Sequence, residues 1–325
     1  MLNRSNTMTR ANAYGVGAYV AGLVMWPQAI LAHSDTSSPL APTELWRHWN
    51  TDLWLLGPVL LSVSLYTLGV SRLWRHAGLE RGISAVRVAA FVSGAFALVI
   101  ALISPLDALG ETLLSAHMVQ HGLLIAVAPP LILLGLPGVA FAWALPTEVS
   151  WRLTRSSSVR AAVRSLSWML NPLVAAAIHG VAVWIWHVPA IFDAALASSS
   201  LHMFEHFSFL ATALLFWQSL LLANRSVSMA VAGVAAAFAT MLHGGFLGAL
   251  ITFAPHTLFV WYVGRTSSWG LNPLEDQQLA GLIMWVPLGI VYFGASLALA
   301  ARLVPPSREE PGQGYRHLRP DIIAR

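Results

Sequence analysis

Two copies of one short motif carry the residues of this chain that are best suited to chemistry. The first copy reads His117-Met118-Val119-Gln120-His121, and the second reads His202-Met203-Phe204-Glu205-His206. Histidines four residues apart lie on one face of a helix, one turn from each other. Imidazole and thioether are ligands that suit copper, and thioether favours the cuprous ion. The two motifs therefore predict a metal site built from paired helical histidines.

Further histidines and methionines are expected at a depth in a membrane similar to that of the two motifs. The expected metal ligands are His117, His121, His202 and His206, with His187 and His243 as further ligands or hydrogen-bonding partners. The candidate soft ligands are Met118, Met203 and Met241. A methionine at helical spacing in an apolar run more often packs than binds metal. His179 lies deeper, where a lone histidine is more often a structural hydrogen bonder.

Polar residues near the motifs are expected to orient the ligands or to contact a partner. Hydrogen bonds from neighbouring groups fix the orientation of metal-ligating side chains. The residues expected in these two roles are Gln120, Glu205, Asp107, Asp193, Asp276 and Gln277. An acid at the start of the last apolar run, such as Asp276, also suits the N-terminus of a helix. Helix capping and partner docking therefore both remain open for Asp276.

The composition is that of a membrane protein. Of the 325 residues, 57% are hydrophobic and 10% are charged, whereas about 25% are charged in an average soluble protein. The chain has no cysteine, which excludes disulfides, thiolate zinc sites and iron–sulfur clusters. The net charge of +4 comes from arginines beside apolar runs, and no nucleic-acid-binding pattern accompanies them. The lipid bilayer is thus an expected partner, and nucleic acid is not.

Seven apolar runs must position the motifs, each near the roughly 20 residues that cross a bilayer. They are residues 53–71, 85–104, 113–136, 171–188, 202–222, 228–252 and 279–303. Arginines gather at the N-terminus, in alternate loops and after the last run, and only Arg47 and Arg265 fall elsewhere. Since basic residues favour the cytoplasmic side, we expect the chain after about residue 33 to start outside and the C-terminus to be cytoplasmic. The predicted fold class is all-α, a polytopic membrane helix bundle of seven transmembrane helices with the histidine cluster toward its outer side.

The two ends of the chain are expected to differ from this membrane domain. Residues 1–32 combine two arginines with an apolar stretch and are typical of a signal peptide or of a first transmembrane helix. Residues 33–304 form the predicted seven-span domain. Residues 305–325 are polar and contain proline, which predicts a disordered cytoplasmic tail.

Several ordered motifs resemble the multi-spanning CtaG family of cytochrome c oxidase assembly factors. They are Ser104-Pro105-Leu106-Asp107, Ser115 to His121 continuing to Ala128-Pro129-Pro130, Trp186-His187-Val188-Pro189, the motif at 202–206, the stretch 274–281 and Met284-Trp285-Val286-Pro287. The resemblance covers about residues 45–303. It implies a protein of the bacterial cytoplasmic membrane that helps to mature a haem–copper oxidase at the copper-insertion stage, with one or more oxidase subunits as partners.

Four functions compete for the histidine motifs. The leading hypothesis is a non-enzymatic protein that holds Cu(I) on outer-leaflet histidines and passes it to an oxidase subunit. Bis-imidazole haem binding also needs histidines on facing helices, and a copper transporter would place histidines along an ion pathway. The fourth is an enzyme, because His202, Glu205 and His206 match the inverted zinc-protease pattern H-x-x-E-H. Against an enzyme, the first motif has Gln120 where that pattern needs its base.

Overall fold

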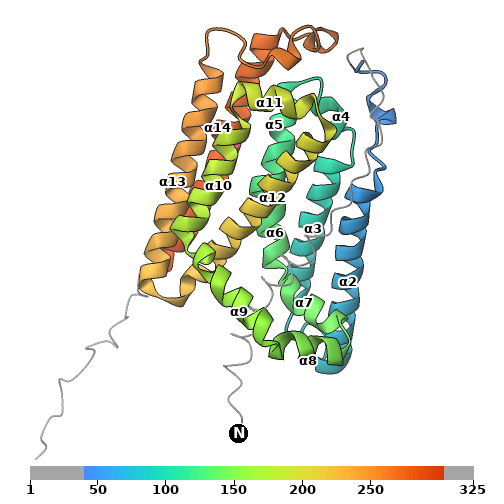
Figure 1. Cartoon of the computed structure of the whole chain (residues 1–325), viewed down its shortest axis with the longest axis vertical. Helices are drawn as coiled ribbons and strands as arrows, with labels where there is room; N and C mark the ends of the chain where they lie inside the picture. The colour runs from blue at the N-terminus through green and yellow to red at the C-terminus, as the bar shows by residue number, and fades with distance from the viewer. Residues whose placement is uncertain (1–39, 304–325) are drawn as a thin grey trace, which may run out of the picture.

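The computed structural model describes residues 40–303, and every regular element in that range is a helix. The longer helices run side by side along the length of the molecule (Figure 1). They are α2 (Leu53–Ala77), α3 (Ala85–Leu102), α5 (Leu114–Gly122) continued by α6 (Ala128–Leu134), α10 (Pro172–Trp186), α12 (Ser199–Leu222), α13 (Val227–Thr252) and α14 (Pro273–Ala301). The prediction of an all-α bundle is confirmed for these residues. The segments predicted as signal peptide or first span (1–32) and as tail (305–325) lie outside the described range.

Several helices are long and apolar enough to cross a membrane. Five qualify by length and composition: Leu53–Ala77, Ala85–Leu102, Leu114–Leu134, Val227–Thr252 and Pro273–Ala301. A sixth is reached if Ser157–Leu170 and Pro172–Trp186, which meet at 78°, count as one span. Each of the seven predicted runs coincides with a helix of the bundle. The 24-residue α12 is long enough, but its polar residues lower its hydropathy and it is not among the five. The count of seven therefore stays a prediction.

The span Leu114–Leu134 is broken by a π-helical segment, η2 (Leu123–Val127), between α5 and α6. Pro129 and Pro130 cause this break because proline has no backbone N–H and its ring crowds the carbonyl four residues earlier. For Pro129 that carbonyl belongs to Ile125. The Trp217 indole on α12 donates a hydrogen bond to this oxygen at 2.8 Å. A neighbouring helix thus satisfies the backbone group that the proline frees, as the membrane interior requires.

The two longest helices, α13 and α14, pack closely through glycine. A Cβ atom on Gly281 would lie 2.5 Å from the Gly248 carbonyl oxygen, and a Cβ on Gly248 would lie 2.8 Å from the Gly281 carbonyl oxygen. Such contacts are possible only without side chains at both positions. Small residues are the usual means by which membrane helices approach. This pair forms one wall of the bundle beside α10 (Figure 1).

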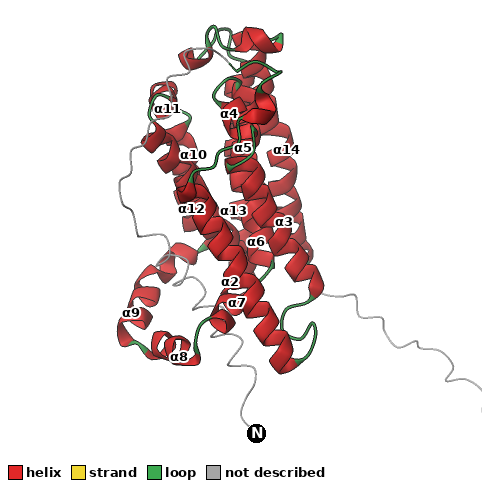
Figure 2. Ribbon diagram, turned by 90° about the vertical axis from the view of Figure 1, so that its right-hand side faces the viewer, coloured by secondary structure: helices red, strands yellow, loops and turns green. Residues whose placement is uncertain are grey.

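Short helices gather at the two ends of the bundle. One end, which we call the α4–α11 end, carries α4 (Leu106–Gly110), α11 (Pro189–Leu196), η5 (Val260–Tyr262) and η6 (Thr266–Trp269). The other, the α8–α9 end, carries α7 (Pro137–Ala144), α8 (Thr147–Arg155) and α9 (Ser157–Leu166). The remaining short elements are η1 (Leu45–Arg47), η3 (Ser167–Leu170) and η4 (Ala223–Arg225). Figures 1 and 2 show the two ends at opposite extremes of the molecule.

Candidate metal centre

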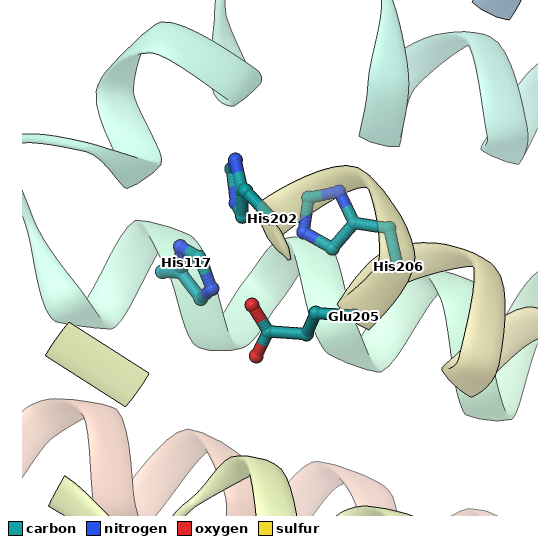
Figure 3. A group of neighbouring side chains, drawn as sticks. All are labelled: His117, His202, Glu205 and His206. Atoms are coloured by element: carbon teal, nitrogen blue, oxygen red, sulfur yellow. The ribbon is translucent and has the colours of Figure 1, made fainter. Parts of the chain in front are cut away.

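The two H-M-x-x-H motifs meet inside the α4–α11 end of the bundle. His117 comes from α5, whereas His202, Glu205 and His206 come from the first two turns of α12. One ligand atom from each of these four side chains lies within 4.8 Å of the other three. Figure 3 shows the Glu205 carboxylate among the three imidazoles. Two helices far apart in the sequence therefore present four groups that could share one metal ion.

Two further histidines extend this cluster. The His121 ring centroid lies 4.2 Å from that of His117 and 5.5 Å from that of His206. The Nε2 atom of His121 is 3.6 Å from Oε1 of Glu205. His187, at the end of α10, lies with its ring centroid 5.7 Å from that of His121. Five of the six histidines expected as ligands thus lie in one cluster, which we call the histidine–glutamate cluster: His117, His121, His187, His202, His206 and Glu205.

The polar atoms of this cluster are buried without enough partners. Within the described residues, both oxygens of Glu205 and both ring nitrogens of His121 have no hydrogen-bond partner. Their side chains are 0% and 2% exposed. A buried polar group without a partner costs roughly 1–3 kcal/mol, and several lie together here. A bound cation could accept lone pairs from the Glu205 carboxylate and from one nitrogen of each neutral ring.

The state of one ring follows from its hydrogen bond. Nδ1 of His187 lies 2.7 Å from the Val183 carbonyl oxygen. A carbonyl can only accept, so Nδ1 carries the proton and the Nε2 atom of the neutral ring has a free lone pair. That Nε2 atom is buried and has no hydrogen-bond partner among the described residues. The backbone of α10 therefore holds His187 in the tautomer that a metal ligand needs.

Aromatic side chains close the cluster on its apolar sides. The Phe192 ring lies 5.1 Å from that of His117, and the Phe209 ring lies 4.7 Å from that of His121. Both phenylalanines are almost completely buried. They keep water from the ring nitrogens and so lower the local dielectric. His202 is the only partly exposed member of the four-group set, which makes its side the natural entry to the cluster.

A carboxylate on α14 fixes the helix that carries the first motif. Asp276 accepts hydrogen bonds from the backbone N–H of Leu114 at 2.6 Å and of Ser115 at 3.2 Å, and from the Ser115 hydroxyl. It therefore caps the N-terminus of α5, where a negative charge is favourable. Its own helix is capped by Asn272 together with Glu275. Of the two roles left open for Asp276, the structure shows helix capping. The helix that Asp276 caps is α5 and not its own helix, α14.

The amide of Gln120 points away from the imidazoles. Its Nε2 atom donates to the Ala101 carbonyl at 2.8 Å and to Asp107 at 2.7 Å. The other oxygen of Asp107 accepts from the Asn50 side chain at 2.9 Å. Gln120 and Asp107 thus join α5 to α3 and α4, and their hydrogen bonds involve no histidine of the cluster.

Three loop contacts complete the scaffold at this end. Asp193 accepts from the backbone N–H groups of Val260 and Trp261 at 3.2 and 3.3 Å. Gln277 accepts from the Leu258 N–H at 2.6 Å. The Tyr262 hydroxyl donates to the Gly110 carbonyl at 2.8 Å, and burial raises the pKa of this hydroxyl well above its usual value. These contacts hold the α13–α14 loop over α4 and α11.

The remaining expected ligands lie elsewhere. His243 and Met241 line a separate small cavity with His179. Met118 is 1% exposed and belongs to the main hydrophobic core, and Met203 is half-buried on α12. The face of the helix on which a histidine lies therefore decides whether it joins the cluster. The position of His243 along its apolar run predicted its depth in the membrane but not its face.

The sequence predicts that Glu205 orients a ligand or contacts a partner, whereas in the structure its carboxylate sits among the candidate ligands. Glu205 directly precedes His206 on α12, and one of its carboxylate oxygens lies within 4.8 Å of a ring nitrogen of His117. The H-x-x-E-H spacing, which also matches the zinc-protease pattern, is the sequence signal for this arrangement.

Searches of curated proteins and of solved structures give no match for this chain. A family profile described as "Cytochrome c oxidase caa3 assembly factor (Caa3_CtaG)" matches residues 64–305. The match includes both histidine motifs, His187, Asp276 and the helices that hold them. The family that the sequence motifs resembled is thereby confirmed, and the chain belongs to the CtaG family of cytochrome c oxidase caa3 assembly factors.

Proposed function

We propose that this protein binds a cuprous ion in the histidine–glutamate cluster and delivers it to a subunit of the oxidase that its family helps to assemble. The ion is cargo, held by neutral imidazoles and passed on by exchange of ligands. No covalent bond of a substrate needs to be made or broken, so the protein acts as a chaperone rather than as an enzyme. The observation that carries the proposal is the convergence of His117, His202, Glu205 and His206 within 4.8 Å.

The donor set supports a metal ion over haem. Four ligand atoms within 4.8 Å of one another can share one ion, whereas a porphyrin would have to pass between them. Imidazole is a good ligand for copper, and the Glu205 carboxylate would offset the charge of the bound ion. A peptide substrate would have to reach a carboxylate that is 0% exposed, which does not favour the zinc-protease alternative.

The distribution of arginine supports an outward-facing cluster. Arg72 and Arg75 lie in the last turns of α2, Arg81 follows this helix, and four more arginines lie on α8 and α9. All of them lie at the end of the bundle opposite the cluster. With this end in the cytoplasm, copper would enter from the outer aqueous side past His202. The client oxidase subunit would then take the ion at the outer surface of the bacterial cytoplasmic membrane.

The test is metal and haem content of detergent-purified protein after anaerobic loading with Cu(I). Wild-type protein is expected to bind at least one equivalent of copper without a Soret band. His121→Ala/His206→Ala should bind at least one equivalent of copper less than the wild type, and His48→Ala/His256→Ala, which changes two histidines outside the cluster, should bind as much as the wild type. A copper content equal to that of the wild type in the first variant would overturn the assignment of the ligands, and a Soret band would show that the protein binds haem.

A further inference from the structure

A small cavity lies deeper in the bundle than the histidine–glutamate cluster, between α10, α13 and α14. It has a volume of about 20 Å³. The residues that line it and could bind an ion or a polar group are His179, His243, Met241, Met284, Tyr292 and Thr240. His179 precedes His187 by eight residues on α10, which places it about 12 Å along the helix axis from the histidine–glutamate cluster. The cavity is therefore separate from that cluster.

Buried polar atoms without partners lie at this cavity. His179 is 1% exposed and Tyr292 is 4% exposed. The Nε2 atom of His179 and the hydroxyl of Tyr292 have no hydrogen-bond partner among the described residues. A cavity needs roughly 10–15 Å³ to hold one water-sized occupant, so this one has room for a single small ligand.

Hydrogen bonds define which nitrogen of His179 is the free one. The Thr212 hydroxyl donates its proton to the Ser208 carbonyl at 2.8 Å. Its oxygen therefore accepts from Nδ1–H of His179, which is 3.0 Å away. With the proton on Nδ1, the Nε2 atom of the neutral ring presents a lone pair. Thr212 thus prepares His179 as a metal ligand, as the Val183 carbonyl prepares His187.

The neighbouring His243 is in the opposite state. The Trp184 indole N–H, which can only donate, lies 3.4 Å from Nδ1 of His243. Nδ1 then accepts, and the proton of the neutral ring is on Nε2. His243 consequently offers a donor rather than a lone pair to the cavity. The remaining soft groups are the thioethers of Met241 and Met284.

We propose that His179, Met241 and Met284 form a second Cu(I) site, deeper in the bundle than the first and of a softer character. One imidazole nitrogen and two thioethers are donors that select the cuprous ion. A water molecule could satisfy His179 and Tyr292 but would gain nothing from the two thioethers that line the same cavity. The softness of these donors is independent of the proposed function, and only the supply of copper to the protein rests on that function.

The test is copper content and X-ray absorption of Cu(I)-loaded protein in nanodiscs, measured in the His121→Ala/His206→Ala background. We expect about one copper with sulfur in its coordination shell. Met241→Leu/Met284→Leu in that background should lose both the copper and the sulfur signal. Leucine is close to methionine in volume, so these substitutions are expected to preserve packing. The matched control is Met169→Leu/Met229→Leu, two methionines outside the cavity, which should leave both unchanged.

The outcomes separate the two sites. No copper in the background variant, with copper bound by the wild type, would overturn the second site and leave the proposed function intact. Equal copper in the wild type and in the background variant, with sulfur in both, would overturn the first site and support the second. Copper that survives Met241→Leu/Met284→Leu would overturn the ligand set proposed for the second site.

Discussion

The Glu205 carboxylate distinguishes the two motifs at the scale of single residues. The first motif has Gln120 at the equivalent position, and its amide is used to join α5 to α3 and α4. The second motif has an acid whose oxygens are buried and without hydrogen-bond partners among the described residues. A negative charge in such a place is costly unless a cation accompanies it. The two copies are therefore similar in sequence but differ in their contribution to the site.

Replacing Glu205 with glutamine tests this difference. Glu205→Gln keeps the size of the side chain but removes the charge that offsets a bound ion. Perturbing groups next to metal ligands typically costs about 10–100-fold in metal affinity, and we expect a loss of at least this size, measured by competition with a Cu(I) chelator. Glu148→Gln, at an exposed position on α8, is the control. Equal affinity of Glu205→Gln and wild type would mean that the carboxylate does not contribute to binding.

The histidine cluster could be predicted from the sequence because helical spacing fixes the face on which side chains lie. The HM-x-x-H motifs placed two histidines on each of two helices, and the structure brings these four together. His243 could not be placed in the same way. Depth along an apolar run says how far a residue lies from the membrane surface, but not toward which neighbour it points. Its contact with Trp184 on α10 depends on how α13 is rotated in the bundle.

At the scale of elements, the break between α5 and α6 is the feature that depends most on a neighbouring helix. The prolines were visible in the sequence, but the partner of the freed carbonyl was not. That partner, Trp217, is 92 residues from Ile125. Such a long-range hydrogen bond follows from the packing of α12 against η2, which no local pattern reveals.

A double-mutant cycle on Pro129 and Trp217 measures this dependence. Trp217→Phe leaves the Ile125 carbonyl without its donor and is expected to lower the free energy of unfolding by about 1–3 kcal/mol. Pro129→Ala restores an N–H that can bond to the same carbonyl. The combined variant should therefore lose less stability than the two single changes predict together. The measurement is denaturant unfolding in detergent followed by circular dichroism, and strict additivity would show that the two groups do not share the carbonyl.

At the scale of the whole molecule, most arginines and the histidine–glutamate cluster occupy opposite ends of the bundle. Two arginines were predicted to lie apart from the others. One of them, Arg265, stacks over the Trp261 ring at 4.2 Å, near the α4–α11 end. The arginines of α8 and α9 lie at the far end (Figure 2). The packing of the helices therefore agrees with an orientation that was inferred from charge alone, although the side of the membrane that each end faces is still a prediction.

The absence of cysteine from the chain makes this orientation directly measurable, because any single introduced cysteine is unique. Ser267 is exposed near the cluster, and Ser158 is exposed on α9 at the arginine-rich end. A membrane-impermeant maleimide added to spheroplasts should label Ser267→Cys at once and Ser158→Cys only after lysis. Since the positive-inside rule acts on loops close to the spans, the arginines of α8 and α9 should hold their end in the cytoplasm. The reverse labelling would place the histidine–glutamate cluster at the cytoplasmic face, and copper would then have to reach it from inside the cell.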